Sequence, residues 1–214
     1  DGRGPSRDVV NTVRADGGHL WLGQPWGGLD RFDLAAGRFL PVPLADDGDG
    51  RLTGEATYDL HPDGDGGVWV ATASGLYHAR TDRILRHLTT ADGLPGTVVY
   101  SIQPDARNRL WLGTSRGLAR FDPATGDVAA YDLADGIGMM EFNRAARLRT
   151  RDGRIWLGGA EGVVAFDPDA IRADERAPTV VLVGAEVASR AGSRAVDTRA
   201  LDRLVLGPAE RTLT

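Results

Sequence analysis

The side chains that could perform chemistry are few and scattered along the sequence. Cysteine is absent, which excludes disulfide bonds and thiolate metal sites. The four histidines show neither an HExxH motif nor a pair spaced four residues apart, so we expect ordinary strand or surface positions for His19, His61, His78 and His87. We therefore predict no catalytic residue, no metal site and no cofactor.

Two acidic segments are the remaining candidates for a metal site. Residues 45–51 read ADDGDGR and residues 61–67 read HPDGDGG. Neither has the spaced ligands and the terminal bidentate glutamate of a calcium loop, whereas Asp and Gly are favoured in turns, so we interpret both segments as turns. The sequence also contains no Gly-x-Ser-x-Gly motif and no glycine-rich phosphate loop.

The composition is that of a soluble globular protein, with 42% hydrophobic and 26% charged residues. The formal net charge is −5 and the 25 basic residues form no continuous stripe, which argues against a nucleic-acid partner. The 29 glycines have no Gly-X-Y period and indicate many tight turns between short strands. No apolar run approaches the roughly 20 residues that span a bilayer. We expect the sequence to be part of a longer protein, and contact with a membrane only through segments outside it.

One pattern of residues recurs four times. Residues 108–126 read NRLWLGTSRGLARFDPATG, and related lines surround three other tryptophans. The four tryptophans are 42 to 48 residues apart, and we take them as the structural anchors of the repeat: Trp21, Trp69, Trp111 and Trp156. A Gly-aliphatic pair follows each of them, and Phe-Asp follows in three of the four units. Such regularity indicates a repeat protein.

Each repeat divides into short alternating runs separated by turn residues, which is typical of β-strands. Four antiparallel strands in about 40 to 45 residues match a blade of a β-propeller. We therefore predict an all-β fold in which Trp and Phe fill the space between blades and glycines permit hairpin turns. The last repeat lacks a predicted outer strand after Phe166. The expected divisions are a blade junction at 1–8, blades at 9–50, 51–90 and 91–134, a closing blade at 135–175, and a further segment at 176–214.

Three segments carry a family resemblance. Residues 91–118, ADGLPGTVVYSIQPDARNRLWLGTSRGL, resemble the two-component regulator propeller repeat. Residues 141–171, EFNRAARLRTRDGRIWLGGAEGVVAFDPDAI, resemble the final blade of that family. The segments 177–187 and 204–214, APTVVLVGAEV and LVLGPAERTLT, are similar to the opening strands of the triple-tyrosine (Y_Y_Y) domain, an immunoglobulin-like β-sandwich.

The resemblance implies a ligand-sensing module of a signal-transduction receptor. It places the module in the periplasmic or extracellular part of a membrane-anchored protein, whose output domain is commonly a histidine kinase and sometimes a diguanylate cyclase. We expect the parent receptor to form a homodimer. Rings in the family hold about seven blades, so four repeats make an incomplete ring with two open apolar flanks, and this chain alone should self-associate or aggregate.

Candidate binding residues follow from the geometry of a propeller, in which one face carries the loops between second and third strands and the starts of the innermost strands. The loop positions are Gln24, Trp26, Ser74, Arg116 and Glu161, and the positions at strand starts are Tyr58, Tyr100, Asn143 and Arg144. Trp26 would stack on a sugar or apolar ligand if exposed. The alternative for Trp26 is packing between blades, and for Arg116 and Glu161 it is a solvated turn.

Carbohydrate is the favoured ligand, followed by a peptide or a partner protein, because aromatic faces combined with Asn and Arg donors suit sugar rings. Two other classes of function stay open. One is a propeller enzyme of the streptogramin lyase type, which would need a histidine with acidic metal partners on one face. The other is a passive scaffold for protein interactions.

Overall fold

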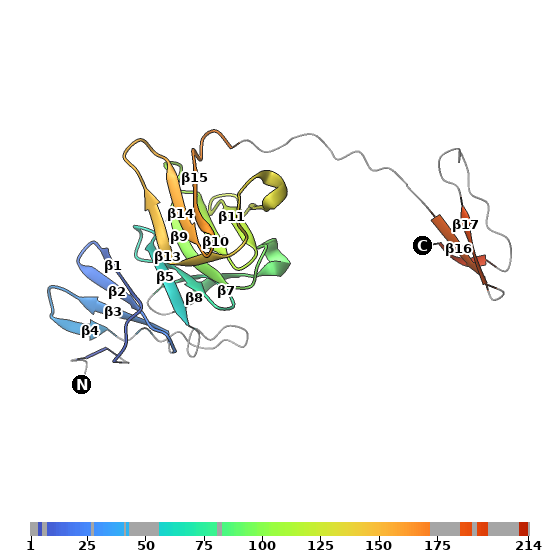
Figure 1. Cartoon of the computed structure of the whole chain (residues 1–214). Helices are drawn as coiled ribbons and strands as arrows, with labels where there is room; N and C mark the ends of the chain where they lie inside the picture. Colours follow the sequence, from blue (N-terminus) through green and yellow to red (C-terminus); the bar gives the residue numbers. More distant parts are fainter. Residues whose placement is uncertain are drawn as a thin grey trace. The chain divides into compact units, whose positions relative to one another are not determined.

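The computed structural model describes most of the chain up to Ile171 and the backbone of three strands beyond it. The described residues are 4–5, 8–26, 28–40, 42, 56–80, 83–171, 185–189, 192–196 and 210–213. The chain divides into two compact units, Asp1–Ile171 and Arg172–Thr214, and each is described by itself (Figure 1).

The described residues of the first unit form four antiparallel sheets, one for each repeat (Figure 1). The first blade contains β1 (Thr12–Asp16), β2 (His19–Gly23), β3 (Leu29–Asp33) and β4 (Arg38–Leu40). The second contains β5 (Thr57–Pro62), β6 (Val68–Thr72), β7 (Gly75–Ala79) and β8 (Ile84–Leu88). The third contains β9 (Val99–Pro104), β10 (Leu110–Thr114), β11 (Gly117–Phe121) and β12 (Val128–Tyr131). The fourth contains β13 (Phe142–Arg149), β14 (Ile155–Gly159) and β15 (Gly162–Phe166).

Within each blade, strands that follow one another in the chain are hydrogen-bonded neighbours. The predicted all-β propeller is therefore confirmed, and each anchor tryptophan lies on the second strand of its blade. Among the described residues the fourth sheet has three strands, in agreement with the missing outer strand in the sequence. Helical structure in the described residues amounts to two 3-10 turns, η1 (Thr90–Asp92) and η2 (Leu133–Asp135), and no helix there is long and apolar enough to cross a membrane.

The described residues of the second unit form an antiparallel sheet of β16 (Ala185–Ser189), β17 (Gly192–Val196) and β18 (Glu210–Leu213), with β16 in the centre. Most of residues 176–214 lie outside the described residues, so the immunoglobulin-like sandwich stays a prediction.

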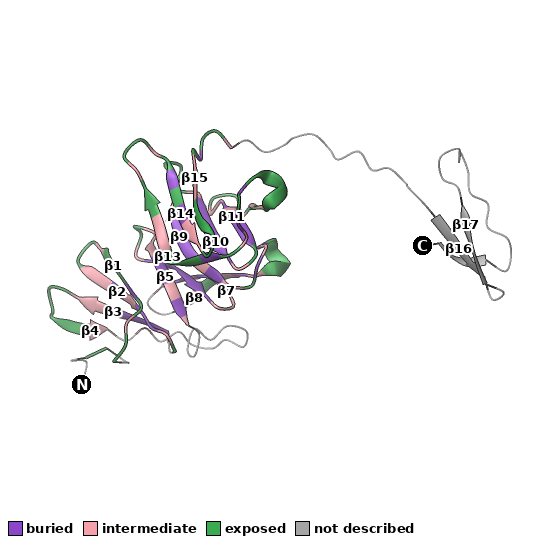
Figure 2. Ribbon diagram, viewed as in Figure 1, coloured by how far each residue is buried: buried purple, intermediate pink, exposed green. Residues whose placement is uncertain are grey.

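The tryptophans pack between blades as the repeat predicts. The Trp69 ring lies edge-on to Phe121 of the next blade at 5.3 Å, and Trp111 lies 4.6 Å from Phe166 of the blade after it. Trp21 is fully buried in a cluster with apolar side chains of the second blade, including Leu60 and Val70. These clusters account for buried stretches along the strands of neighbouring sheets, and Figure 2 shows buried residues in purple. Their burial is the main source of stability in a propeller because each blade covers the next.

The glycines serve two purposes, of which the sequence indicated one. Gly75 and Gly117 begin third strands with φ values of 133° and 114°, and a Cβ at either residue would meet a backbone oxygen of the adjacent outer strand. These are the predicted turn glycines. Gly113, in the Trp-Leu-Gly line, is needed for a different reason: a Cβ there would lie 2.8 Å from Cβ of Phe142 in the next blade. Glycine therefore follows Trp111-Leu112 because the innermost strand of the next blade, β13, passes too close to β10 for a side chain at this position.

Candidate functional site

Three of the four innermost strands depart from regular pairing near their first residues. The pairing of β5 with β6 shifts between Thr57 and Asp59, which leaves Tyr58 as an additional residue. The pairing of β9 with β10 shifts in the same way, because Val99 and Ser101 face consecutive residues of β10 and Tyr100 lies between them. The longest irregularity is in β13, between Phe142 and Arg147. Such β-bulges turn a side chain away from its ordinary direction and are frequent next to functional sites.

The bulges bring three of the predicted binding residues together. The rings of Tyr58 and Tyr100 are 5.5 Å apart, and Cζ of Arg144 lies 4.4 Å from the centre of the Tyr58 ring. We name Tyr58, Tyr100 and Arg144 the bulge cluster. A cation over an aromatic ring contributes about 0.5–1 kcal/mol at an exposed site. The two tyrosines are half-buried and Arg144 is exposed, so the cluster presents two aromatic surfaces and a guanidinium to solvent.

The backbone beside the cluster is strained. Ala145 adopts a φ of 50°, in the left-handed region that residues with a Cβ rarely occupy. Asn143, the fourth residue predicted at the strand starts, lies on the same bulged segment and is exposed. Strain of this kind costs about 1–3 kcal/mol and persists where the surrounding structure imposes it, often at ligand sites.

The environment of Tyr100 further disfavours loss of its proton. Partial burial raises the pKa of the Tyr100 hydroxyl above its ordinary value of 10.0, and the nearby carboxylate of Glu141 acts in the same direction. Like any tyrosine hydroxyl, that of Tyr100 is protonated at neutral pH and is able to donate a hydrogen bond to a ligand oxygen.

The loop residues predicted for the same face have different environments. The Gln24 side chain is buried, and its amide donates to Oδ2 of Asp30 at 2.5 Å, so it stabilises its own loop and does not face outward. Trp26 is 71% exposed, which excludes packing between blades within this chain.

The loop residues of the other blades lie at or near the surface. Arg116 and Glu161 are exposed. Arg116 lines a separate small hollow with Tyr131 and Met140. Ser74 contacts Tyr77 through its hydroxyl.

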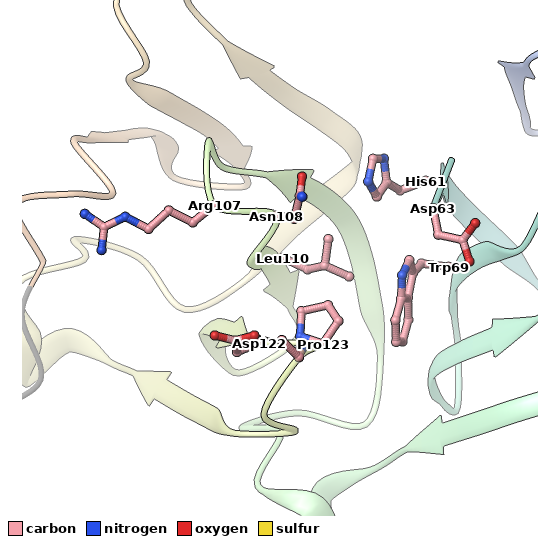
Figure 3. A pocket seen from close by; sticks show the side chains of 9 residues that line it. His61, Asp63, Trp69, Arg107, Asn108, Leu110, Asp122 and Pro123 are labelled. Atoms are coloured by element: carbon pink, nitrogen blue, oxygen red, sulfur yellow. Dashed lines mark hydrogen bonds between the residues drawn. The ribbon is translucent and has the colours of Figure 1, made fainter. Parts of the chain in front are cut away.

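A second concave region lies at the opposite ends of the same strands, between the second and third blades (Figure 3). Its cavity of about 370 Å³ is lined on one side by His61, Asp63 and Trp69, and on the other by residues of the third blade such as Arg107 and Asp122. The sequence did not predict this pocket, because residues from two different repeats line it.

The charges of this second pocket are set by burial and hydrogen bonds. Burial lowers the pKa of His61 below 6.5, and Arg147 acts in the same direction. Burial alone would raise the pKa of Asp63, but it is lowered because the carboxylate accepts hydrogen bonds from the amides of Asp65 and Gly67 and from His78. Asp63 is thus a turn acceptor, and among the described residues no group of three or more His, Asp or Glu is placed to hold a metal.

A buried ionic cluster connects the innermost strands of all four blades. Asp59 of β5 is fully buried and accepts from Arg14 of β1 at 2.6 Å and from Arg147 of β13, while Arg147 also donates to Gln103 of β9 at 3.3 Å. We name Arg14, Asp59, Gln103 and Arg147 the Asp59 cluster. The repeat pattern gave no signal for it, because these residue types differ from one blade to the next.

The comparisons with known proteins agree with this architecture. Residues 93–116 match the family model of the two component regulator propeller. The structure resembles the extracellular domain of BT4673 from B. thetaiotaomicron, a protein described as a hybrid two-component system, with a TM-score of 0.65 and 20% identity over 97% of this chain and 30% of that chain. It also resembles PorZ, a surface component of the type-IX secretion system of Porphyromonas gingivalis, with a TM-score of 0.60 and 17% identity over 90% of this chain and 29% of that chain.

A likeness to a streptogramin B lyase has a TM-score of 0.55 and 13% identity over 89% of this chain and 69% of that chain. A search of curated protein sequences returned no match. At these low identities the structural likeness shows a shared fold alone, and this chain spans less than a third of the BT4673 and PorZ chains with which it was compared. The class of protein is therefore a β-propeller, and a segment that includes the first two strands of its third blade is similar to the two component regulator propeller model.

Proposed function

We propose that this chain is a non-catalytic, ligand-sensing propeller module in the extracytoplasmic part of a membrane-anchored signal-transduction receptor. The family match to the two component regulator propeller and the likeness to an extracellular domain of a two-component system protein support the sensor class. The parent would be a histidine kinase or a diguanylate cyclase through a domain outside this sequence.

The observation that carries the proposal is the bulge cluster. Three bulged strands from three different blades place aromatic rings and a guanidinium side by side, although regular pairing would point these residues elsewhere. A passive scaffold has no need for such an arrangement or for the positive φ of Ala145. Concentrated irregularity of this kind is expected where a ligand is held.

Carbohydrate is the ligand class that this chemistry favours. The faces of Tyr58 and Tyr100 suit the apolar faces of sugar rings, and Arg144 and Asn143 supply hydrogen-bond donors for hydroxyl or carboxylate oxygens. In the parent receptor, binding transmits a signal only if the ligand has a higher affinity for one arrangement of the domains than for another.

The proposal is tested by calorimetric titration of the full chain with neutral and acidic oligosaccharides. We expect Tyr58→Ala and Arg144→Ala to weaken binding by at least about tenfold, as for side chains at the centre of an interface. Arg149→Ala is the matched control, because Arg149 is an exposed arginine at the other end of β13. Equal affinity in all three variants would remove the bulge cluster from the site. Trp26→Ala and Arg116→Ala examine the two predicted loop positions in the same assay.

A lyase would differ from a non-catalytic sensor in what happens to the bound ligand. The likeness to streptogramin B lyase concerns the fold. We expect bound oligosaccharide to be recovered unchanged after long incubation with the chain, as judged by mass spectrometry. Turnover of any ligand would overturn the non-catalytic part of the proposal.

A further inference from the structure

Among the described residues, the anchor tryptophan of the second blade lacks a hydrogen bond that its counterparts in the first and third blades make. In the third blade, Nε1 of Trp111 donates to Oδ2 of Asp105 at 3.1 Å, and the first blade has the same kind of bond at 3.4 Å. The counterpart of Asp105 in the second blade is Asp63, but no described acceptor binds Nε1 of Trp69. Trp69 is only 5% exposed, and a buried donor without a partner is unfavourable.

Other donors occupy the Asp63 carboxylate. Oδ1 accepts from the amides of Asp65 and Gly67, and Oδ2 accepts from Nε2 of His78 at 2.8 Å. The His78 ring is stacked on the Trp69 ring at 4.0 Å, so it covers the face of the indole and offers no acceptor in the plane of the N–H. The indole nitrogen is not fully enclosed, and the ring lines the cavity between the second and third blades (Figure 3). The N–H is therefore available to a molecule in this cavity.

The cavity lies where the repeat has a glycine in place of a long side chain. Between the third and fourth blades, Arg109 donates to Asp105 at 2.7 Å and to the carbonyl of Pro168 at 3.2 Å. Its counterpart in the second blade is Gly67, because each lies two residues before the anchor tryptophan and its amide binds the turn aspartate. The first and fourth blades have His and Arg at this position. Pro123, the counterpart of Pro168, lines the cavity, and among the described residues no side chain donates to its carbonyl.

The walls of the cavity combine hydrogen-bonding groups with apolar surface. His61 pairs with Trp69 on the adjacent strand and lines the same cavity, and its imidazole has no hydrogen-bond partner among the described residues. An uncharged imidazole, which burial favours by lowering the pKa of His61, offers one donor and one acceptor. Leu110 and Pro123 supply apolar surface on the other wall, and Asn108 adds an exposed amide (Figure 3).

Size and charge restrict what the cavity can hold. Its volume of about 370 Å³ is that of a pocket for a small molecule. The lining has two carboxylates, Asp63 and Asp122, and one guanidinium, Arg107, which disfavours an anion. A simple cation has no acceptor for the N–H of Trp69. A molecule with several hydroxyl groups can accept from Trp69 and donate to the carbonyl of Pro123, because a hydroxyl is both donor and acceptor.

We propose that this cavity is a second binding site, for a small uncharged molecule with several hydroxyl groups, such as a monosaccharide. Both of its walls belong to blades that this chain contains, and it lies at the opposite ends of the strands from the bulge cluster. Trp69 donates to a ligand oxygen, and a ligand hydroxyl donates to the carbonyl of Pro123, as Arg109 does to that of Pro168.

The test follows the indole N–H signals of the full chain by NMR during titration with glucose, galactose, mannose and xylose. The five tryptophans give separate signals, and sequential assignment identifies that of Trp69 without a variant at this core residue. We expect at least one of the sugars to move the Trp69 signal saturably and further than the other four indole signals. Glucuronate and glucosamine, the charged comparisons, should bind more weakly than the neutral sugar.

Two variants on equivalent turns locate the site. Ala124→Phe places a ring on the exposed turn that lines the cavity and should abolish the saturable shift. Ala35→Phe is the matched control, because Ala35 is exposed on the same turn of the first blade and both amides bind the turn aspartate. It should retain the shift.

The outcomes separate this site from the bulge cluster. Tyr58→Ala, which changes the bulge cluster, should leave the shift of the Trp69 signal intact, so the two proposals can fail separately. Absence of a saturable shift with all the neutral sugars would overturn the proposal. Tighter binding of a charged comparison, or a shift that survives Ala124→Phe or is lost equally in Ala35→Phe, would overturn it as well.

Discussion

The guanidinium of Arg147 in the fourth blade pairs with both carboxylate oxygens of Asp59 in the second blade, 88 residues earlier in the chain. Arg14 of the first blade binds the same carboxylate, and the amide of Ile102 in the third blade donates to it at 3.0 Å. One buried acid therefore connects the innermost strands of four sheets.

Replacing Asp59 should be among the most damaging single changes in the chain. Asp59→Asn removes the negative charge and leaves two arginines with one neutral partner, which we expect to lower the free energy of unfolding by about 3 kcal/mol, as for a broken buried ion pair. Equilibrium unfolding in urea measures the difference. Asp65→Asn is the matched control: Asp65 pairs with Arg80 at the exposed surface, and its loss should leave stability almost unchanged. Similar midpoints for both variants would show that the Asp59 cluster contributes little.

Close approach of neighbouring blades predicts a clear difference between two equivalent glycines. Gly113→Ala would place a methyl group 2.6 Å from Oγ of Ser101 and 2.8 Å from Cβ of Phe142, so we expect a loss of about 1–3 kcal/mol, the range for overpacking a core. Gly158→Ala, at the same place in the fourth blade, meets the Cβ of Ala146 at 3.1 Å and should cost less. Thermal unfolding of both variants checks the order, and the reverse order would contradict the explanation.

Stability should decrease in mildly acidic solution through His61. Because burial lowers the pKa of His61 below 6.5, the folded state favours the neutral imidazole and the unfolded chain binds the proton more readily. The contribution is present above pH 6.5 and is lost as the pH falls toward the folded pKa. When the pH is lowered from neutral toward the folded pKa, the free energy of unfolding of His61→Gln should therefore decrease less than that of the wild type. Urea unfolding of both proteins at the two pH values measures the difference. Equal losses would exclude His61 as the cause.

The features that recur in every repeat could be predicted from the sequence. Spacing and alternation gave the strands, the blades and the position of each tryptophan, because those features depend on local periodicity. The starts of the innermost strands were also predicted as a binding face. Tyr58, Tyr100 and Arg144 lie close together there, and their role in binding stays a prediction. The repeat did not reveal which of the loop residues point outward, so Gln24 was grouped with Trp26 although its side chain is buried.

Features that depend on single, unrepeated residues could not be predicted. The Asp59 cluster joins side chains from four units, and nothing in the spacing shows that Arg147 reaches the second blade. The bulges depend on additional residues in a strand, one in β5 and in β9 and several in β13, which a pattern of period two cannot locate from one sequence. The glycine of the Trp-Leu-Gly line was attributed to turns because its true neighbour, Phe142 in the case of Gly113, is distant in sequence.

The strained residue beside the bulge cluster gives a final prediction that joins stability to binding. Ala145 has a φ of 50°, a conformation that glycine adopts without a steric penalty, so Ala145→Gly should raise the free energy of unfolding by up to about 1 kcal/mol. Ala146→Gly is the matched control. Ala146 does not have a positive φ, and its replacement should cost about 0.5–1 kcal/mol through the greater freedom of the unfolded chain.

If the strain holds Arg144 over Tyr58, relieving it should also loosen the site. Ala145→Gly should then weaken oligosaccharide binding in the calorimetric assay even though the protein is more stable, whereas an ordinary destabilising change would lower both quantities. A variant that is less stable than wild type, by the same amount as Ala146→Gly, would show that Ala145 is not strained and that the backbone of β13 tolerates this conformation freely.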